Sequence, residues 1–193
     1  MLINLRGPSG SGKSTAVLGV LAQCPHRPIY GALGRLPEAY ALCARPVFVI
    51  GPYTTHCGGC DRILPFALVP QLIERYAALG HVVFEGLLMS TFYGAIGRLL
   101  MEARDAAVLF LNTPVETCIA RVEARRRAAG NVRPFNSKLL AQKHATIARL
   151  KPKFGTRAVS VSDRDATAII MRLLSTSAQH TPDSGGHVRT HRP

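Results

Sequence analysis

Residues 7–15 read GPSGSGKST, which matches the pattern G-x-x-x-x-G-K-[ST]. The apolar stretch Leu2–Leu5 comes before it, and a helical pattern over Lys13–Cys24 follows it. In this strand–loop–helix context the pattern is called the P-loop, because its backbone N–H groups surround a phosphate at a helix N-terminus. The sequence therefore predicts a nucleoside triphosphate site formed by Gly7, Pro8, Ser9, Gly10, Ser11, Gly12, Lys13, Ser14 and Thr15.

Two side chains of this loop have separate chemical tasks. Lys13 is expected to reach the β- and γ-phosphates, and the Ser14 hydroxyl is expected to ligate Mg²⁺. ATP and Mg²⁺ are therefore the expected cofactors.

Apolar runs bounded by turn residues alternate with helical patterns along the rest of the chain. We expect strands at Leu2–Leu5, Pro46–Ile50, His81–Glu85, Ala106–Leu111 and Ala158–Val161. We expect helices at Lys13–Cys24, Pro70–Leu79, Thr91–Arg104, Val115–Ala129, Asn136–Leu150 and Arg164–Ser175. This alternation predicts an α/β fold of the P-loop NTPase type, with three α/β/α layers and a mostly parallel sheet. Residues 1–175 form the expected domain, and the polar tail 176–193 is expected to be disordered.

Composition and length limit the possible classes of protein. The chain has 193 residues, of which 47% are hydrophobic, so it is long enough for one globular core. It has no run of about 18 apolar residues, so we expect no membrane span. The first expected strand begins at Leu2, so we expect no signal peptide and a cytoplasmic location. Five cysteines at irregular spacing favour reduced thiols over a disulfide framework.

Two carboxylates are well placed for chemistry. Active sites of open α/β sheets lie at the carboxyl ends of strands, and Glu85 ends the expected strand His81–Glu85. Asp61 lies in the irregular stretch before it. Either group is expected to hold Mg²⁺ through water or to accept a proton from an attacking hydroxyl. The sequence leaves open which carboxylate holds the metal and which accepts the proton. The simpler alternatives are that Glu85 is a solvated acid at a strand end and that Asp61 is a turn-forming aspartate.

Arginines gather on the helix that follows the strand Ala106–Leu111. Arg121 and Arg125 are four residues apart and therefore share a helix face. Arginines brought over a P-loop stabilise the charge of a transferring phosphoryl group. We therefore expect an Arg-rich lid here, with a solvated basic helix end as the alternative. The chain has no N-K-x-D motif, which argues against a GTPase.

The P-loop, Glu85 and the segment TPVETCIARVEARRRAAGN (113–131) together resemble the nucleoside and thymidylate kinase group of P-loop kinases. Within that group, GPYTTHCGGCDRI (51–63) and GHVVFEGLLMSTFYGAIGRL (80–99) resemble the bacteriophage kinases that phosphorylate 5-hydroxymethyluracil in DNA. The resemblance covers Met1 to about Arg157. It implies an ATP-dependent kinase, and a host-cytoplasmic one if a phage encodes it. The chain lacks the D-R-[YH] triplet of thymidylate kinases, with CDRI in the comparable region, so thymidylate is in doubt as a substrate.

The motif HCGGC, residues 56–60, invites a zinc interpretation. A lone C-x-x-C supplies only two ligands and has no matching second pair, so we favour a glycine-kinked loop that lines the acceptor pocket.

The charge distribution bears on the acceptor. The net charge is +13, and residues 121–157 contain eleven Lys and Arg against one acidic residue. Such an excess favours a nucleic-acid backbone as partner, so the expected acceptor is DNA containing 5-hydroxymethyluracil. The alternatives are a kinase of free deoxynucleosides or their monophosphates, and an ATP-dependent nucleic-acid-binding switch without kinase activity. No membrane partner is expected, and a homodimer is left open.

Overall fold

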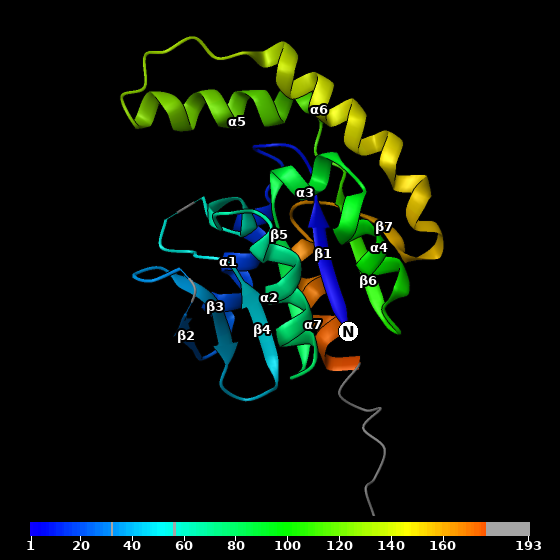
Figure 1. Ribbon diagram of the computed structural model, residues 1–193. Helices are drawn as coiled ribbons and strands as arrows, with labels where there is room; N and C mark the ends of the chain where they lie inside the picture. The colour runs from blue at the N-terminus through cyan, green and yellow to red at the C-terminus, as the bar shows by residue number, and fades with distance from the viewer. Residues whose placement is uncertain (32, 56, 177–193) are drawn as a thin grey trace, which may run out of the picture.

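The computed structural model describes residues 1–31, 33–55 and 57–176. These residues form one seven-stranded sheet with helices on both faces (Figure 1). The strands are β1 (Leu2–Arg6), β2 (His26–Tyr30), β3 (Pro37–Leu42), β4 (Val47–Ile50), β5 (His81–Glu85), β6 (Ala106–Leu111) and β7 (Ala158–Val161). Their order across the sheet is β2-β3-β4-β5-β1-β6-β7. From β4 to β7 in this order all neighbours are parallel, whereas β2 and β3 are antiparallel.

All five expected strands are confirmed, and β2 and β3 are additions that the sequence analysis missed. Strand β2 reads HRPIY and is largely exposed, so it lacks the apolar run that marks a buried strand. Its Pro28 is tolerated because β2 lies at the edge of the sheet. A proline there lacks its backbone N–H without removing a hydrogen bond from the interior of the sheet.

The helices follow the expected order with small shifts at their ends. They are α1 (Lys13–Gln23), α2 (Leu68–Ala77), α3 (Leu87–Thr91), α4 (Gly94–Glu102), α5 (Val115–Ala128), α6 (Ser137–Leu150) and α7 (Ala166–Thr176), with 3-10 turns η1 (Cys60–Arg62) and η2 (Lys151–Arg157). The helix expected at Thr91–Arg104 is in fact α4, and the separate short helix α3 precedes it. No helix in the part of the chain that the structure describes is long and apolar enough to cross a bilayer. The expected tail lies outside the described residues from position 177 onward.

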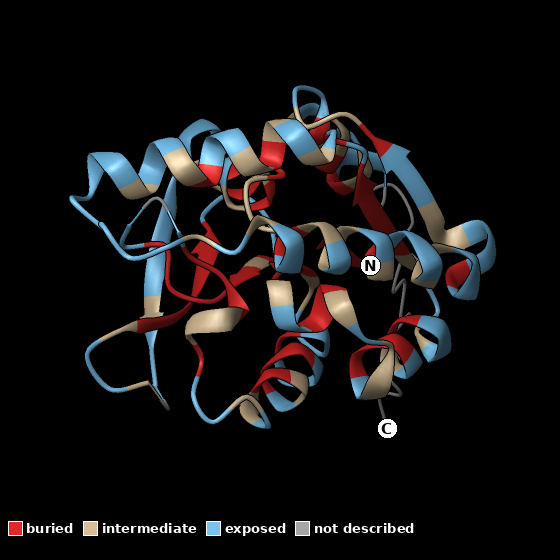
Figure 2. Cartoon of the chain, turned by 90° about the horizontal axis from the view of Figure 1, so that it is seen from above, coloured by how far each residue is buried: buried red, intermediate tan, exposed pale blue. Residues whose placement is uncertain are grey.

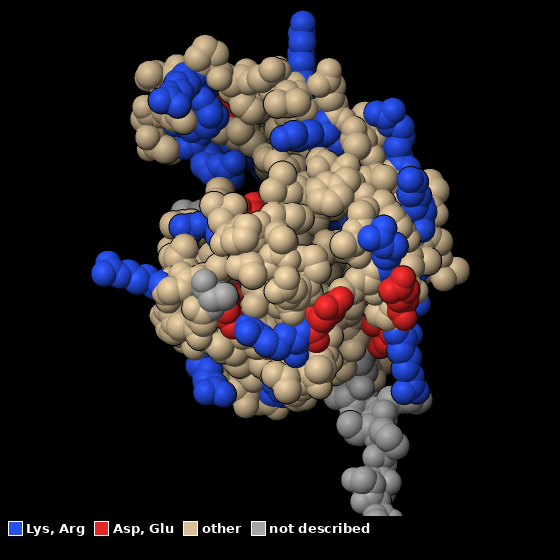
Figure 3. All heavy atoms as spheres, in the orientation of Figure 1, with Lys and Arg blue, Asp and Glu red and all other residues tan. Residues whose placement is uncertain are grey.

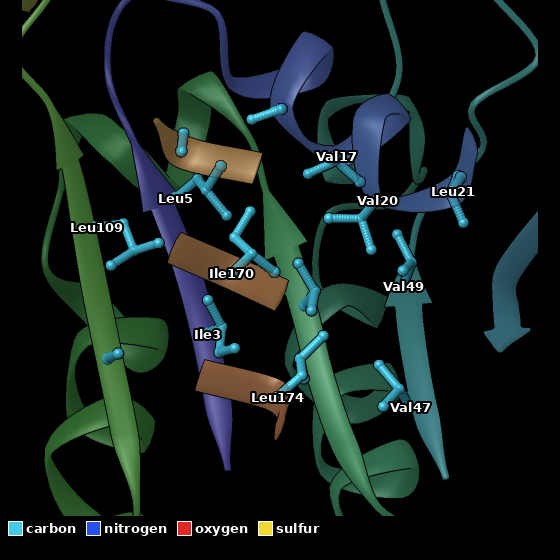
Figure 4. Close-up of a cluster of buried hydrophobic side chains, with 14 of the residues drawn as sticks. Ile3, Leu5, Val17, Val20, Leu21, Val47, Val49, Leu109, Ile170 and Leu174 are labelled. Carbon is cyan, nitrogen blue, oxygen red and sulfur yellow. The ribbon is translucent and has the colours of Figure 1, made fainter. Parts of the chain in front are cut away.

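Alternate residues of the strands point into two cores, one on each face of the sheet. Ile3 and Leu5 of β1 belong to the core beneath α1 and α7, together with Ile170 (Figure 4). Leu2 of the same strand belongs to the other core, beneath α2 and α4. This period-two alternation is what a sheet covered on both faces requires. The predicted three-layer α/β/α fold is confirmed.

Helices α5 and α6 form an arm, Val115–Leu150, that lies beyond the carboxyl ends of the parallel strands (Figure 1). A third, smaller cluster of buried residues holds the two helices together, formed by Cys118, Val122 and Leu140. Most of the remaining surface of the arm is exposed, whereas the central strands β1, β5 and β6 are almost entirely buried (Figure 2). The arm thus covers the edge of the sheet at which α/β enzymes bind their ligands.

A buried arginine connects β1 to the helices above it. Arg6 is fully buried, its Nε donates to Asn4 Oδ1 at 2.8 Å, and its Nη1 donates to the Phe92 carbonyl at 3.2 Å. Its guanidinium carbon lies 4.5 Å from the ring centroid of Phe154, which is also fully buried. Burial lowers the pKa of Arg6 to about 10. The ring and the carbonyl therefore replace part of the water that this cation loses, whereas its Nη2 is buried without a hydrogen-bond partner among the described residues.

We predict that Phe154→Ala destabilises the protein by about 3–5 kcal/mol, because it leaves a cavity and removes the ring beneath a buried cation. Chemical unfolding measures the change. Leu79→Ala is the control, since Leu79 is 60% exposed and its loss is expected to cost less than about 0.5 kcal/mol. A loss below about 1 kcal/mol at Phe154 would contradict the role assigned to this ring.

Candidate active site

The P-loop folds around the lysine that begins α1. Gly12 caps this helix with φ +98°, in the left-handed region, where a side chain would also meet Asp163. Lys13 Nζ donates to the carbonyls of Gly7 at 2.8 Å and Pro8 at 3.0 Å. Burial lowers the pKa of Lys13, and the nearby Glu85 opposes the shift. The ammonium group is thus held inside the loop, where a phosphate would approach it.

Glu85 ends β5 beside the P-loop. It is 1% exposed, and its Oε1 accepts a hydrogen bond from Ser14 Oγ at 2.8 Å. Burial raises the pKa of Glu85, and the charge of Lys13 and the Ser14 hydrogen bond oppose that shift. Gly59, at φ +86°, passes so close that a Cβ there would overlap the Glu85 carboxylate. The Glu85 carboxylate therefore lies between the P-loop and the Cys57–Cys60 loop.

Asp61 lies on the opposite wall and holds α3 in place. One of its carboxylate oxygens accepts from the Leu87 backbone N–H at 2.5 Å, and the other accepts from Leu88 at 2.9 Å. Asp61 therefore has a structural contact with the start of α3, which differs from the turn-forming role that the sequence analysis kept as an alternative. The next residue, Arg62, donates to the hydroxyls of Thr54 at 3.1 Å and Thr55 at 3.3 Å. This wall thus offers a carboxylate and a guanidinium on adjacent residues.

The two arginines expected in the lid reach down from α5. Arg121 Nη1 lies 2.7 Å from Asp163 Oδ2 and donates to the Gly10 carbonyl at 3.3 Å. Arg125 Nη1 lies 2.9 Å from Cys57 Sγ. Arg121 therefore connects the arm to the P-loop, and Arg125 connects it to the loop on the acceptor side.

One open cavity of ≈740 Å³ brings these groups together. All the predicted site residues except Gly7 line it, and Gly7 lies behind the loop as the acceptor of the Lys13 hydrogen bond. Figure 3 shows the hollow between the arm and the body of the protein. The residues of the lining are Pro8, Ser9, Gly10, Ser11, Gly12, Lys13, Ser14, Thr15, Thr55, Cys57, Gly58, Asp61, Arg62, Glu85, Leu87, Arg121, Arg125 and Asp163.

Six of these lining residues were not among the predicted site residues: Thr55, Cys57, Gly58, Arg62, Leu87 and Asp163. Asp163 follows β7 at the same edge of the sheet as Glu85, so its strand position would have indicated it, and Arg62 adjoins the predicted Asp61. Leu87 is apolar and gives no chemical signal in the sequence. A neighbouring cavity of ≈500 Å³ shares Arg121 and Asp163 with the main one and extends along the β7–α7 loop.

The Cys57–Cys60 loop contains one buried and one exposed thiol. Burial raises the pKa of the Cys60 thiol, whose Sγ lies 3.9 Å from the Ile50 carbonyl, whereas Cys57 is exposed and faces Arg125. Within residues 1–31, 33–55 and 57–176, no three His, Cys, Asp or Glu side chains are grouped to hold a metal ion. His56 lies outside the described residues.

Part of the basic stretch 121–157 is already used inside the protein. Arg126 binds the Arg133 carbonyl at 2.6 Å, Arg157 binds the Leu100 carbonyl, and Lys151 binds Ser160. On the arm, four basic side chains have no hydrogen-bond or acidic partner among the residues that the structure describes: Arg127, Arg133, Lys138 and Lys143. Figure 3 shows basic side chains over the arm and few acidic ones near it.

Comparison with known proteins identifies similar kinases. A family model described as 5-hmdU DNA kinase matches residues 60–164, a range that contains Asp61, Glu85, Arg121 and Arg125. The chain is 36% identical to a 5-hmdU DNA kinase of Pseudomonas phage PaMx11 over 69% of its length and 73% of that relative. It is 32% identical to a 5-hmdU DNA kinase of Pseudomonas phage M6, over 89% of its length and 98% of the relative.

Solved structures with the same fold are also kinases. A gluconokinase from Sinorhizobium meliloti 1021 superposes with a TM-score of 0.52 at 20% identity, over 93% of this chain and 96% of the other. A deoxyadenosine kinase from M. mycoides with bound dATP gives a TM-score of 0.50 at 12% identity, over 91% and 100%. At these identities the likeness concerns the fold alone, which is that of P-loop kinases.

We predict that Glu85→Gln does not lower the melting temperature at pH 7 without nucleotide. Because burial raises the pKa of Glu85, the folded protein binds this proton more tightly than the unfolded chain does. The free energy of unfolding of the wild type therefore falls as the pH rises from the ordinary pKa of glutamate through the raised pKa of Glu85. At pH 7 the ionised carboxylate of Glu85 still lowers that free energy. Glutamine is neutral at every pH, so the variant does not have the destabilising effect of a buried negative charge.

Thermal unfolding at pH 7 and at about pH 4 tests this prediction, since the difference between Glu85→Gln and wild type is expected to shrink at the lower pH. Glu74→Gln, on the exposed face of α2, is the control and is expected to leave the melting temperature unchanged at both pH values. A clear loss of stability in Glu85→Gln at pH 7 would refute the assigned cause.

Proposed function

We propose that this chain, which belongs to the 5-hmdU DNA kinase family, transfers the γ-phosphate of ATP to the hydroxymethyl oxygen of 5-hydroxymethyluracil in DNA. The observation that carries the proposal is the single cavity in which the P-loop, Glu85 and the Arg-bearing arm face the wall of Asp61 and Arg62. A phosphoryl donor on one side and a hydroxyl acceptor on the other would meet in this space. A phage kinase of this class would meet its DNA in the host cytoplasm.

The residues present fit a triphosphate and Mg²⁺. Ser11 Oγ is buried and has no hydrogen-bond partner in the described part of the chain, and Lys13 Nζ is held only by backbone carbonyls. Ser14 Oγ and the Glu85 carboxylate adjoin each other as hard oxygen donors. We assign Ser14 as a direct ligand of Mg²⁺ and Glu85 as a ligand through water. When bound, the ion would neutralise negative charge on the β- and γ-phosphates.

The adjoining cavity beside the β7–α7 loop suits the nucleoside part of ATP. It is continuous with the P-loop through Arg121 and Asp163, which line both spaces. Arg121 would then lie where the triphosphate passes from one cavity to the other. Arg121 and Arg125 would spread the negative charge of the transferring group from above.

The chemical step is a single transfer. The hydroxymethyl oxygen forms a bond to the γ-phosphorus while the bond from that phosphorus to the β,γ-bridging oxygen breaks, so ADP leaves. The hydroxyl proton goes to a carboxylate, and we assign this role to Asp61, because Glu85 is already paired with Ser14. Leu87 and Leu88 donate to Asp61 and fix its orientation toward the cavity.

DNA is the preferred acceptor because of the arm. Arg127, Arg133 and Lys143 of the arm have no partner among the described residues, and a phosphodiester backbone is the polyanion that they would neutralise. A base within a duplex must leave the stack to enter an enclosed site, so single-stranded or flipped substrates are the expected forms.

The decisive experiment offers one acceptor series to the wild type with γ-labelled ATP and Mg²⁺. The series contains DNA with 5-hydroxymethyluracil, matched thymine DNA, free deoxynucleosides and their monophosphates. We expect label only in the modified DNA. Lys13→Ala is expected to abolish transfer while the melting temperature shows a folded protein, because the variant loses the cation that meets the β- and γ-phosphates.

Label only on small acceptors would make the protein a kinase of free nucleotides. ATP hydrolysis with DNA binding but no labelled acceptor would make it a nucleic-acid-binding switch. Transfer that persists in Lys13→Ala would refute the assigned P-loop chemistry.

We further predict that Asp61→Asn lowers kcat by about 100-fold or more, the usual range for loss of a general base. The affinity for ATP is expected to stay within about twofold, since the residue lies on the acceptor wall. A kcat within about tenfold of the wild type would leave Asp61 with only its structural role on α3.

A further inference from the structure

A small groove leads out of the active-site cavity beneath the arm. Its volume is ≈130 Å³, and Ser9, Leu87 and Arg125 line both the groove and the main cavity. The groove therefore continues the active site rather than forming a separate depression. It lies between the start of α3 and the arm, next to Ser9 of the P-loop.

The lining of the groove combines an apolar surface with positive charge. Leu87 of α3 forms one side, and the other side comes from the arm, including Phe135, Leu139 and Leu140. Leu139 is 46% exposed although it lies beside the apolar cluster of the arm. An aliphatic side chain left open next to an active site is suited to contact with a flat, weakly polar ligand group.

Lys143 supplies the charge at this position. It is half-buried in the groove and has no acidic partner within residues 1–31, 33–55 and 57–176. Arg125 adds a second cation at the junction with the main cavity. An apolar wall with adjoining cations matches one repeating unit of a nucleic-acid strand, which has a base with an apolar face and an anionic phosphodiester.

We propose that this groove binds the nucleotide next to the target in the DNA strand, with its base against Leu139 and the bridging phosphodiester at Lys143. The inference rests on the proposed function and adds to it a subsite for the polymer. A lone nucleoside would leave the groove empty, so the subsite gives the enzyme a physical basis for preferring a strand over a free nucleoside.

Two pairs of variants separate the groove from the general charge of the arm. Lys143→Ala and Lys138→Ala remove the same charge from the same helix, but only Lys143 lines the groove. Leu139→Ala and Val132→Ala each truncate an exposed aliphatic side chain, and Val132 is 95% exposed on the connection between α5 and α6.

The substrates are trinucleotides with 5-hydroxymethyldeoxyuridine at the centre. One has natural neighbours, a second has abasic neighbours, and a third has neutral methylphosphonate linkages. We measure kcat/KM for transfer and, separately, the affinity for the same fluorescently labelled trinucleotides. The binding measurement does not require phosphoryl transfer, so a failure of the kinase proposal and a failure of the groove proposal give different results.

With the natural trinucleotide, Lys143→Ala is expected to lower kcat/KM and affinity about tenfold, as for loss of a charge-assisted contact, and Lys138→Ala less than about twofold. Leu139→Ala is expected to lower both about fivefold and Val132→Ala to leave them unchanged. The Lys143 effect should vanish with methylphosphonate linkages, and the Leu139 effect should vanish with abasic neighbours, because each variant and each substrate change then remove the same contact.

Equal effects of Lys143→Ala and Lys138→Ala would overturn the proposal and leave only a diffuse positive field. The proposal would also be overturned if each protein variant lowered kcat/KM and affinity by the same factor with the altered trinucleotides as with the natural one. If the wild type transfers no phosphate but the binding pattern holds, the groove stands and the kinase assignment falls.

Discussion

The active site depends on two opposite charges that are both withdrawn from water. Lys13 and Glu85 are almost completely buried, and the charge of each lowers the cost of burying the other. They meet because β1 and β5 are parallel neighbours with Leu5 level with Glu85, so the P-loop that follows β1 lies beside the end of β5. The register of two central strands therefore sets the distance between the phosphate loop and its carboxylate. The buried apolar residues of both strands fix that register, since a slip of one residue would turn them toward the wrong core.

The acceptor side is built differently, from short elements that hold one another. Asp61 fixes the start of α3, and Arg62 fixes the hydroxyls of Thr54 and Thr55. Gly59 lets this loop press against Glu85, so the acceptor-side loop and the end of β5 are in contact. The phosphate-donor side is built on central strands and the acceptor side on loops. This arrangement suits a reaction in which the donor is always the same nucleoside triphosphate and the acceptor is part of a large molecule.

The sequence predicted those parts of the protein that depend on local pattern. The P-loop and the five parallel strands follow from glycine spacing and apolar runs. Strand β2 was missed because its edge position permits a proline and polar residues. Arg6 was missed because its role arises from a contact with a residue distant in the sequence, Phe154. The basic stretch was predicted as a whole, but the sequence cannot separate cations bound inside the protein, such as Arg157, from open ones such as Lys143.

The separate small core of the arm has a consequence for how such enzymes diverge. Cys118, Val122 and Leu140 hold α5 to α6 without drawing on either of the two main cores. Ile147 of α6 still belongs to a main core and Arg121 still binds the P-loop, so the part of the arm that lies apart from both is its exposed connection, residues 129–134. Selection can remodel this part to suit a different sequence context or strand conformation while the catalytic body stays constant. Exchange of this connection between related chains is accordingly a practical route to kinases with altered target preference.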